Sequence, residues 1–295
     1  MSHEIMRLSA FAPAKVNLFL HVGGPDGEGY HPISSLMVFA DVGDRVNLQP
    51  ADAPAFETSG PFGDQIPAGG DNLVVRAGQA FHRRLGGPVP PYRLILEKHL
   101  PIAAGLGGGS SDAGAALKLL RDALAPALSD DDLEALAASL GADGAACLRA
   151  RALIAEGRGE RLSPAPRLPE LNAVLVNPGA PSPTGAVYRA YDAGVHPDGA
   201  AMPPMPDHLE SAEEAAAWLA FATRNDLEAP AVRLEPHIGE VLDVLRGEPE
   251  SLLVRMSGSG ATCFALCASD IEAEGLAERL ETMRPDWWVR RCRLS

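Results

Sequence analysis

The sequence has 295 residues with 25 basic and 39 acidic side chains, which gives a formal net charge of −14 at pH 7. This acidic balance argues against nucleic acid or an anionic membrane as a partner, because both favour a basic surface. No apolar run approaches the ~20 residues of a membrane span, and the N-terminus lacks a signal-peptide core. We therefore expect a cytoplasmic protein whose four cysteines are reduced: Cys147, Cys263, Cys267 and Cys292.

The first half of the chain alternates strand and helix patterns. Apolar alternation predicts strands over residues 8–11, 16–22, 35–39, 45–49 and 92–97. Helical periodicity predicts helices that begin near Asn72 and near Asp112. A third helix is predicted between a capping Ser129 and a terminating Gly141. Residues 51–70, rich in Pro, Gly and Asp, are expected to form a surface loop.

The second half begins after a proline-rich boundary near residues 164–169. A buried strand is predicted over residues 173–176, and residues 193–208 are predicted to be a loop. Ser211 and Glu214 have the spacing of a capping box for the next helix. A strand at 261–267, a helix at 271–283 and a strand at 287–292 end the chain. The pattern predicts an α+β protein with one domain over residues 1–165 and a second over 166–295.

Residues 101–113, PIAAGLGGGSSDA, are the most informative segment. Four glycines precede two serines and a helical pattern. Glycines allow the backbone to approach an anion closely, and a helix N-terminus directs free N–H groups at it, so we expect a phosphate site. The alternative is a tight turn in which Ser110 or Ser111 only caps the helix. The segment matches neither the Walker A pattern GxxxxGK[ST] nor GxGxxG.

This segment resembles the second motif of the GHMP small-molecule kinases, Pro-x-x-x-Gly-Leu-Gly followed by small residues and serines. Pro101, Gly105, Leu106 and Gly107 match in place. The added Gly108 and Gly109 before the serines are similar to the branch whose members phosphorylate 4-diphosphocytidyl-2-C-methylerythritol.

Other segments resemble the same family in the expected order. The first motif matches at Pro13, Ala14, Lys15, Asn17, Leu18, Leu20, Gly29, Tyr30 and His31. Residues 256–266 resemble the third motif, a second glycine-rich loop before a strand. Residues 225–228 (NDLE) and Pro183-Thr184 with Tyr188 resemble further segments. The resemblance implies a two-domain fold, with an N-terminal ATP-binding domain like ribosomal protein S5 domain 2 and a ferredoxin-like C-terminal sandwich.

The resemblance also implies an ATP site built from the second motif. Its members here are Lys98, Pro101, Gly105, Leu106, Gly107, Gly108, Gly109, Ser110 and Ser111. We expect Mg²⁺ to arrive with ATP and a serine hydroxyl, Ser111 or Ser110, to bind it. Lys98, just before the loop, is placed to meet phosphate charge, or it is a solvated strand end.

The resemblance makes Asp143 the catalytic carboxylate and Lys15 its partner near the acceptor hydroxyl. Taken alone, an aspartate two residues beyond a terminating glycine is typical of a solvated or capping residue. The family usually continues Asp-Val-Pro, whereas this chain has Gly144 and Ala145. Glycine adds backbone freedom at that point, so the sequence predicts a more loosely held carboxylate.

On the acceptor side, the resemblance assigns cytosine recognition to His31, beside an aromatic Tyr30. Asn17, Thr184, Tyr188, Gly258 and Ser259 complete the expected substrate site. The implied activity is ATP-dependent transfer of phosphate to the 2-hydroxyl of a small cytidyl substrate by a monomer or weak homodimer. The alternatives are a related kinase for homoserine, a sugar or mevalonate, and a nucleotide-binding sensor without turnover.

Overall fold

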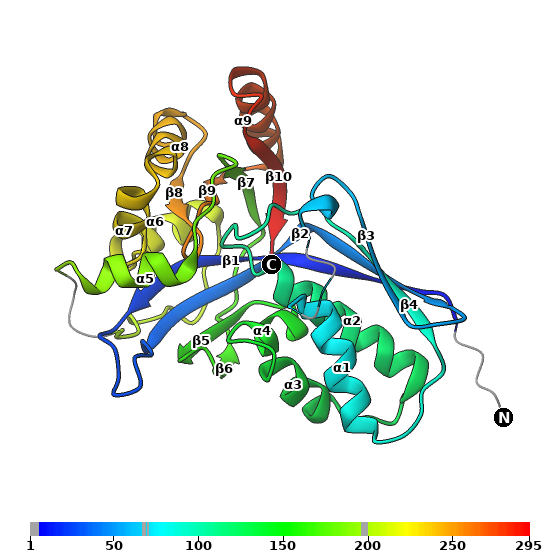
Figure 1. The fold of residues 1–295 in the computed structure, drawn as a ribbon. Helices are drawn as coiled ribbons and strands as arrows, with labels where there is room; N and C mark the ends of the chain where they lie inside the picture. The colour runs from blue at the N-terminus through cyan, green and yellow to red at the C-terminus, as the bar shows by residue number, and fades with distance from the viewer. Residues whose placement is uncertain (1–5, 67–68, 70, 196–199) are drawn as a thin grey trace. The chain divides into compact units, whose positions relative to one another are not determined.

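The computed structural model describes residues 6–66, 69, 71–195 and 200–295, and their ribbon is drawn in Figure 1. The chain forms two compact units that interleave along the sequence. The first contains the chain up to Ala14, Gly43–Ile102 and Gly107–Ala150, and the second contains Lys15–Val42, Ala103–Leu106 and Arg151–Ser295. The predicted domain limits, 1–165 and 166–295, remain a prediction. Within the described ranges, no helix is long and apolar enough to cross a membrane.

Two long strands contribute to both units. β1 (Leu8–Val22) and β2 (Ile33–Pro50) are each continuous where the sequence predicted two short strands. The predicted strands left gaps at residues 12–15 and 40–44, where apolar alternation is interrupted. The interruptions mark changes of surroundings along a single strand.

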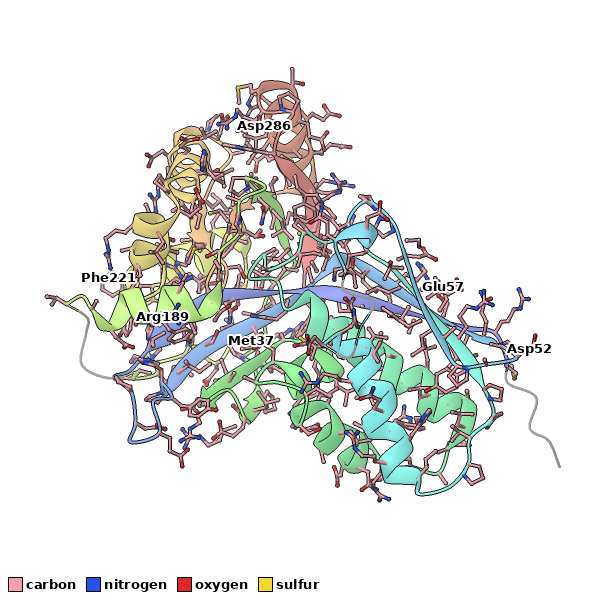
Figure 2. The ribbon with its side chains drawn as sticks, in the orientation of Figure 1. Met37, Asp52, Glu57, Arg189, Phe221 and Asp286 are labelled. Carbon is pink, nitrogen blue, oxygen red and sulfur yellow. The ribbon has the colours of Figure 1, made fainter. Side chains whose placement is uncertain are left out.

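The strands of the first unit lie around residues 45–50 of β2. These residues pair antiparallel with β4 (Tyr92–Glu97), which pairs in parallel with β3 (Ala55–Ser59). β3 corrects the prediction that residues 51–70 are only a loop. It was missed because no residue of this strand is fully buried, so it lacks an apolar face. Its Glu57, labelled in Figure 2, forms an ion pair with Arg93 of β4 at 3.2 Å.

The helices of the first unit begin at the caps that the sequence predicted, except for two. The Asn72 side chain accepts a hydrogen bond from Val74 N at the start of α1 (Leu73–Leu85), and Ser129 does so from Asp132 N at α3 (Asp130–Ala138). α2 (Gly108–Leu124) begins earlier than expected, and α4 (Gly144–Arg149) was not expected. α3 ends at Ala138, before the predicted stop at Gly141. A short 3₁₀ turn covers Gly63–Gln65.

The second unit is built on antiparallel strands. β10 (Trp288–Leu294) pairs with β7 (Leu171–Asn177), β7 with β9 (Cys263–Cys267), and β9 with β8 (Leu253–Met256). The first part of β2 pairs with β5 (Leu153–Gly157), which pairs with β6 (Arg161–Pro164). Every residue of β7 is buried, which confirms the strand predicted from its apolar run.

Five helices belong to the second unit: α5 (Thr184–Asp192), α6 (Ala212–Ala222), α7 (Glu228–Leu234), α8 (Pro236–Gly247) and α9 (Asp270–Met283). α8 and α9 carry apolar side chains into the same core as β7 and β9. Ser211 caps α6 by accepting a hydrogen bond from Glu214 N, as predicted, while the Glu214 carboxylate accepts one from Glu210 N. In the predicted loop at 193–208, residues 193–195 and 200–208 contain no helix or strand, and 196–199 lie outside the described residues.

Candidate active site

The glycine-rich segment turns sharply into α2. Gly105 and Gly107 have positive φ angles of 74° and 61°, a conformation that favours glycine, and Gly107 is the N-cap of α2. Gly108 to Ser111 therefore form the first turn of the helix, which corrects the prediction of a helix starting near Asp112. The sequence misled because glycine is a poor helix former, yet the first turn of this helix begins with two glycines. The N–H groups of such a turn have no partner within the helix and are directed at its N-terminal end.

Pro101 is buried in the first unit just before this turn, whereas Gly105 and Leu106 belong to the second unit. Leu106 O accepts a hydrogen bond from Lys15 N at 2.8 Å within that unit. Within the predicted phosphate segment, Gly105 and Leu106 are thus assigned to the second unit and Gly107 to Ser111 to the first.

Lys98 is buried and paired with two carboxylates. Its Nζ donates to Asp44 Oδ2 at 2.5 Å and to Asp112 Oδ2 at 2.7 Å, and its side chain is 3% exposed. Asp44 Oδ1 also accepts hydrogen bonds from the main-chain N–H groups of His99 and Leu100, at 2.6 and 2.9 Å. These two ion pairs join β2, the end of β4 and the start of α2. The reading of Lys98 as a solvated strand end is wrong, and its predicted contact with phosphate remains a prediction.

This cluster contains one ammonium for two buried carboxylates. Burial raises the pKa of Asp112 to about 7, an effect that the neighbouring Lys98 opposes and Asp44 increases. The two carboxylates in turn raise the pKa of Lys98 against the effect of its burial. A Cβ atom at Gly108 would lie 3.0 Å from Lys98 Nζ. Glycine at this position therefore lets the ammonium lie close beneath the first turn of α2.

Asp143 lies at the N-cap position of α4, half-buried, with φ −82° and ψ −3°. Its carbonyl accepts a hydrogen bond from Cys147 N at 2.9 Å. α4 packs on α2, where a Cβ atom at Gly114 would lie 3.2 Å from the Cα atom of Leu148. Cys147 Sγ also lies 3.8 Å from the carbonyl oxygen of Gly107, the N-cap of α2. Asp143 and the start of α2 thus share one packed pair of helices.

Gly144 explains the departure from the family pattern after Asp143. A Cβ atom here would lie 1.9 Å from the carbonyl oxygen of Ala137, so the backbone of α4 touches the end of α3. Gly144 itself is buried. The glycine fits a close approach of the backbone that a side chain would prevent, and the more loosely held Asp143 carboxylate remains a prediction.

Lys15 and Asn17 form one buried polar group on β1 in the second unit. Lys15 Nζ donates to Asn17 Oδ1 at 2.6 Å, and Asn17 Nδ2 donates to Ser35 Oγ at 2.7 Å. Ser35 Oγ donates to the carbonyl oxygen of Phe19 at 2.6 Å. Lys15 and Asn17 are 4% and 2% exposed, so the ammonium is held in a fixed direction by side chains that are themselves fixed.

The second glycine-rich loop lies against Gly105 and Asn17. Ser257 Oγ donates to Gly105 O at 3.0 Å and accepts from Asn17 N at 3.1 Å. A Cβ atom at Gly105 would lie 2.3 Å from Ser257 O, and one at Gly258 would lie 3.1 Å from Gly105 O. Ser259 Oγ is 2.9 Å from Thr184 Oγ1 at the start of α5. The predicted residues Asn17, Gly105, Gly258, Ser259 and Thr184 are therefore joined in one network.

His31 and Tyr188 stack on one another, with ring centroids 4.9 Å apart. His31 Nδ1 is 2.8 Å from Gly23 O, and Nε2 is 3.3 Å from Asp192 Oδ1. Both ring nitrogens thus have protein partners, while in the described part of the chain the main-chain N–H and C=O of His31 make no hydrogen bond. Tyr30 is 57% exposed, and the Arg158 guanidinium lies 4.3 Å from its ring centroid.

Sequence reasoning missed three polar residues of these networks, Asp44, Asp112 and Ser35, and named a fourth, Ser257, only as part of the third motif. Asp112 follows the serines directly and Ser257 opens the third motif, so both were within view. For Asp112 and Ser257 the signal was a polar residue inside an otherwise apolar or glycine-rich run. Asp44 contacts Lys98 across 54 positions, which no local pattern indicates.

Comparison with known proteins places this geometry in a family. The family model for the GHMP kinases N terminal domain matches residues 72–151, and that for the GHMP kinases C terminal matches residues 207–285. The chain belongs to the GHMP kinase family, and its α+β fold is that of this family.

Two curated relatives are named 4-diphosphocytidyl-2-C-methyl-D-erythritol kinase. The protein from a Caulobacter strain is 76% identical, over 98% of this chain and 99% of its own length. The protein from Dinoroseobacter shibae is 47% identical, over 96% of this chain and 93% of its own. A crystal structure of 4-(cytidine 5'-diphospho)-2C-methyl-D-erythritol kinase matches with a TM-score of 0.77 and 35% identity, over 98% of this chain and 99% of that one. A homoserine kinase from Cytophaga hutchinsonii, 17% identical with a TM-score of 0.68, shares the fold.

Proposed function

We propose that this protein transfers the γ-phosphate of ATP to the 2-hydroxyl of 4-diphosphocytidyl-2-C-methyl-D-erythritol, a step of the non-mevalonate route to isoprenoids. The observation that carries the proposal is the 76% identity, across nearly the whole chain, to a relative that bears this kinase's name. Two structural features also support it. Lys15 of the first motif is buried and bonded to Asn17, and the glycine-rich second motif forms the N-terminus of a helix.

For ATP, we propose that the phosphates lie at the N-terminal end of α2. The N–H groups of Gly108, Gly109 and Ser110 and the positive end of the helix dipole would stabilise their negative charge. Such a cradle needs little positive side-chain charge, which suits a chain whose net charge is −14. Pro101, Gly105, Leu106 and Gly107 would set the path of the turn.

Magnesium is proposed to enter with ATP. Ser111 Oγ is buried and makes no hydrogen bond within the described ranges, so its oxygen is available as a ligand of the kind that magnesium prefers. Ser110, half-buried on the same turn, is the other hydroxyl. Bound magnesium would neutralise developing phosphate charge. Ser111→Ala should raise the magnesium concentration needed for half-maximal rate more than Ser110→Ala, and the reverse order would assign Ser110.

For the chemistry, we propose that Asp143 accepts the proton of the acceptor hydroxyl. The hydroxyl oxygen then forms a bond to the γ-phosphorus as the bond to the β–γ bridging oxygen breaks, and ADP leaves. The Lys15 ammonium would stabilise the charge that develops on the reacting oxygens. Its fixed direction on β1 is what such a role requires.

For the acceptor, we propose that His31 reads cytosine through its main chain. Its ring nitrogens are directed at Gly23 and Asp192, which leaves the peptide N–H and C=O as the groups to pair with a base edge. The exposed Tyr30 and the half-buried Tyr188 would contact the faces of the base, and Thr184, Gly258 and Ser259 would complete the pocket. CDP should therefore compete with the acceptor better than UDP, because the two bases differ at this edge.

The roles of Asp143 and Lys15 are tested by Asp143→Asn and Lys15→Met. Each should lower kcat by about 100-fold or more while the Kd for ATP stays close to that of the parent. Lys118→Met is a matched control, because Lys118 is the third and last lysine of the sequence and is half-buried on α2. An unchanged kcat in either test variant would remove that residue from the mechanism.

A further inference from the structure

The segment Asn225–Glu228 joins α6 to α7 and has no part in the mechanism above, yet its side chains are engaged with other segments of the second unit. Asn225 is 8% exposed. Its Nδ2 donates to Met256 O at 2.7 Å and to Gly258 O at 2.8 Å, while its Oδ1 accepts from Leu227 N at 2.9 Å. Both amide N–H donors are therefore used, and two of the three hydrogen bonds hold the second glycine-rich loop.

Glu228 binds the main-chain N–H of Met256, the residue whose carbonyl group Asn225 binds. Its Oε2 accepts a hydrogen bond from Met256 N at 2.9 Å, and its Oε1 accepts one from Arg246 Nη2 at 2.8 Å. Both main-chain polar groups of Met256 are thus bound by side chains of the segment. Hydrogen bonds to a charged acceptor are stronger than neutral ones, so Glu228 is well suited to fix this peptide group.

The same segment is joined to β1, the strand that carries Lys15 and Asn17. Leu20 N donates to Arg224 O, and Asp226 N donates to Leu20 O, both at 2.9 Å. Asp226 Oδ2 accepts from Val22 N at 2.8 Å. The segment is therefore a bridge between the catalytic strand and the second glycine-rich loop.

The position of Met256 in turn affects Gly105 and Asn17, two residues of the proposed site. Ser257 follows Met256 directly, and its hydroxyl is bonded to both Gly105 O and Asn17 N. Because a Cβ atom at Gly105 would lie 2.3 Å from Ser257 O, the backbone of Gly105 lies directly against this loop, and a shift of the Met256–Gly258 backbone must move Gly105 or Asn17 with it.

We propose that Asn225 and Glu228 are positioning residues for the phosphoryl transfer. They set the backbone of Met256–Gly258 and, through Ser257, the places of Asn17 and Gly105 relative to the Lys15 ammonium. The proposal rests on the proposed kinase function and assigns part of its precision to a segment outside the residues proposed above to bind ATP and the acceptor. A misplacement of about 1 Å can lower a rate by about 100-fold, so fixing this backbone matters to kcat.

The test uses Asn225→Ala, Glu228→Ala and Glu228→Gln in the full chain. Asn172→Ala is the matched control, because Asn172 is a buried asparagine of the same unit that pairs with Cys267, at the end of β9 away from the loop. Three quantities are measured on fully folded protein: kcat, KM for ATP, and the ratio of ADP released to acceptor phosphorylated. Hydrogen exchange of the Ser257 and Gly260 amides, which donate to Thr262 O and Ser257 O, is followed as well.

Asn225→Ala and Glu228→Ala should lower kcat by about 10- to 100-fold with little change in KM for ATP. Their ADP-to-product ratio should rise above that of the parent, and exchange at Ser257 and Gly260 should become faster. Glu228→Gln keeps an oxygen that can accept from Met256 N and should recover most of the rate. Asn172→Ala should keep the parent's kcat and ratio. Loss of activity only in proportion to unfolded protein, or a Gln variant as poor as the Ala variant, would overturn the proposal.

The outcome separates this proposal from the proposed function. If the parent phosphorylates a different acceptor, the kinetic comparison is made with that acceptor, and only the substrate assignment fails. If the parent shows no turnover at all, the exchange measurement decides, because it needs no substrate. Unchanged exchange at Ser257 and Gly260 in both alanine variants would overturn the positioning role even if the kinase assignment is right.

Discussion

Replacing Lys98 by methionine tests whether this lysine holds the fold together or serves the phosphates. The substitution keeps the length of the side chain and removes the ammonium that neutralises Asp44 and Asp112. All three side chains are at most 3% exposed, so water cannot replace the lost partner. Removing one member of a buried ion pair typically costs about 3–5 kcal/mol, which is a large fraction of the ~5–15 kcal/mol stability of a protein.

The same cluster predicts a pH dependence whose direction follows from the raised pKa of Asp112. In the folded protein this carboxyl titrates near pH 7, against an ordinary value of 3.8, so between these values the folded state holds a proton that the unfolded state has lost. The contribution of this group to stability therefore falls as the pH rises from about 4 to 7 and changes little above that range. Asp112→Asn removes the titrating group and should flatten this part of the profile.

The assay is urea unfolding at pH 5 and pH 8, together with the KM for ATP of the folded fraction. Lys98→Met should lose about 3–5 kcal/mol at pH 8, and Lys98→Met/Asp112→Asn should recover part of it because only one carboxylate then lacks a partner. Lys118→Met serves as the control for loss of a lysine. If Lys98→Met is nearly as stable as the parent but needs far more ATP for half-maximal rate, Lys98 is a phosphate ligand and the reasoning is wrong.

Three further substitutions test close contacts. Gly144→Val introduces the residue that is usual in the family. Its side chain would contact Ala137, so it should destabilise the protein by about 1–3 kcal/mol and lower kcat by moving Asp143. A thermal unfolding midpoint equal to the parent's would contradict this. Gly105→Ala should weaken ATP binding, measured by calorimetry, because the new methyl group meets Ser257 O at a positive φ; parent-like affinity would refute it. Arg255→Met removes the guanidinium hydrogen bonds to the carbonyl oxygens of Leu18, Leu219 and Thr223 and should cost about 2–3 kcal/mol in urea unfolding, whereas a loss under 1 kcal/mol would mean that these bonds contribute little to stability.

Much of the fold follows from local sequence signals. The alternation in β4 and the caps Asn72, Ser129 and Ser211 act over a few residues, so they are readable without tertiary contacts. β3 lacks an apolar face, and α4 is a short helix buried on all sides, so neither has the periodicity that identifies an element. The start of α2 was misjudged because glycine is a poor helix former, whereas Gly108 here allows a close approach to Lys98 and Gly109 one to Leu73.

The candidate site was predictable in its residue types and not in its connections. Lys15, Asn17 and the glycine-rich segments were identified by their motifs, but the pairing of Lys98 with Asp44 spans the first unit and has no local signature. The engagement of both His31 ring nitrogens depends likewise on Asp192, far along the chain. The close contact of Gly144 with Ala137 arises from the way α4 packs on α3. It gives a structural reason for the glycine at a position where the family usually has valine.

The most direct test of the central claim is ADP release by the purified protein with magnesium and ATP. 4-Diphosphocytidyl-2-C-methyl-D-erythritol, homoserine, galactose and mevalonate are offered in parallel, and the phosphorylated product is identified by mass. We predict turnover with the cytidyl substrate alone and a stoichiometry of one ADP per product. Turnover with another acceptor would contradict the substrate assignment, and bound ATP without any turnover would contradict the kinase itself.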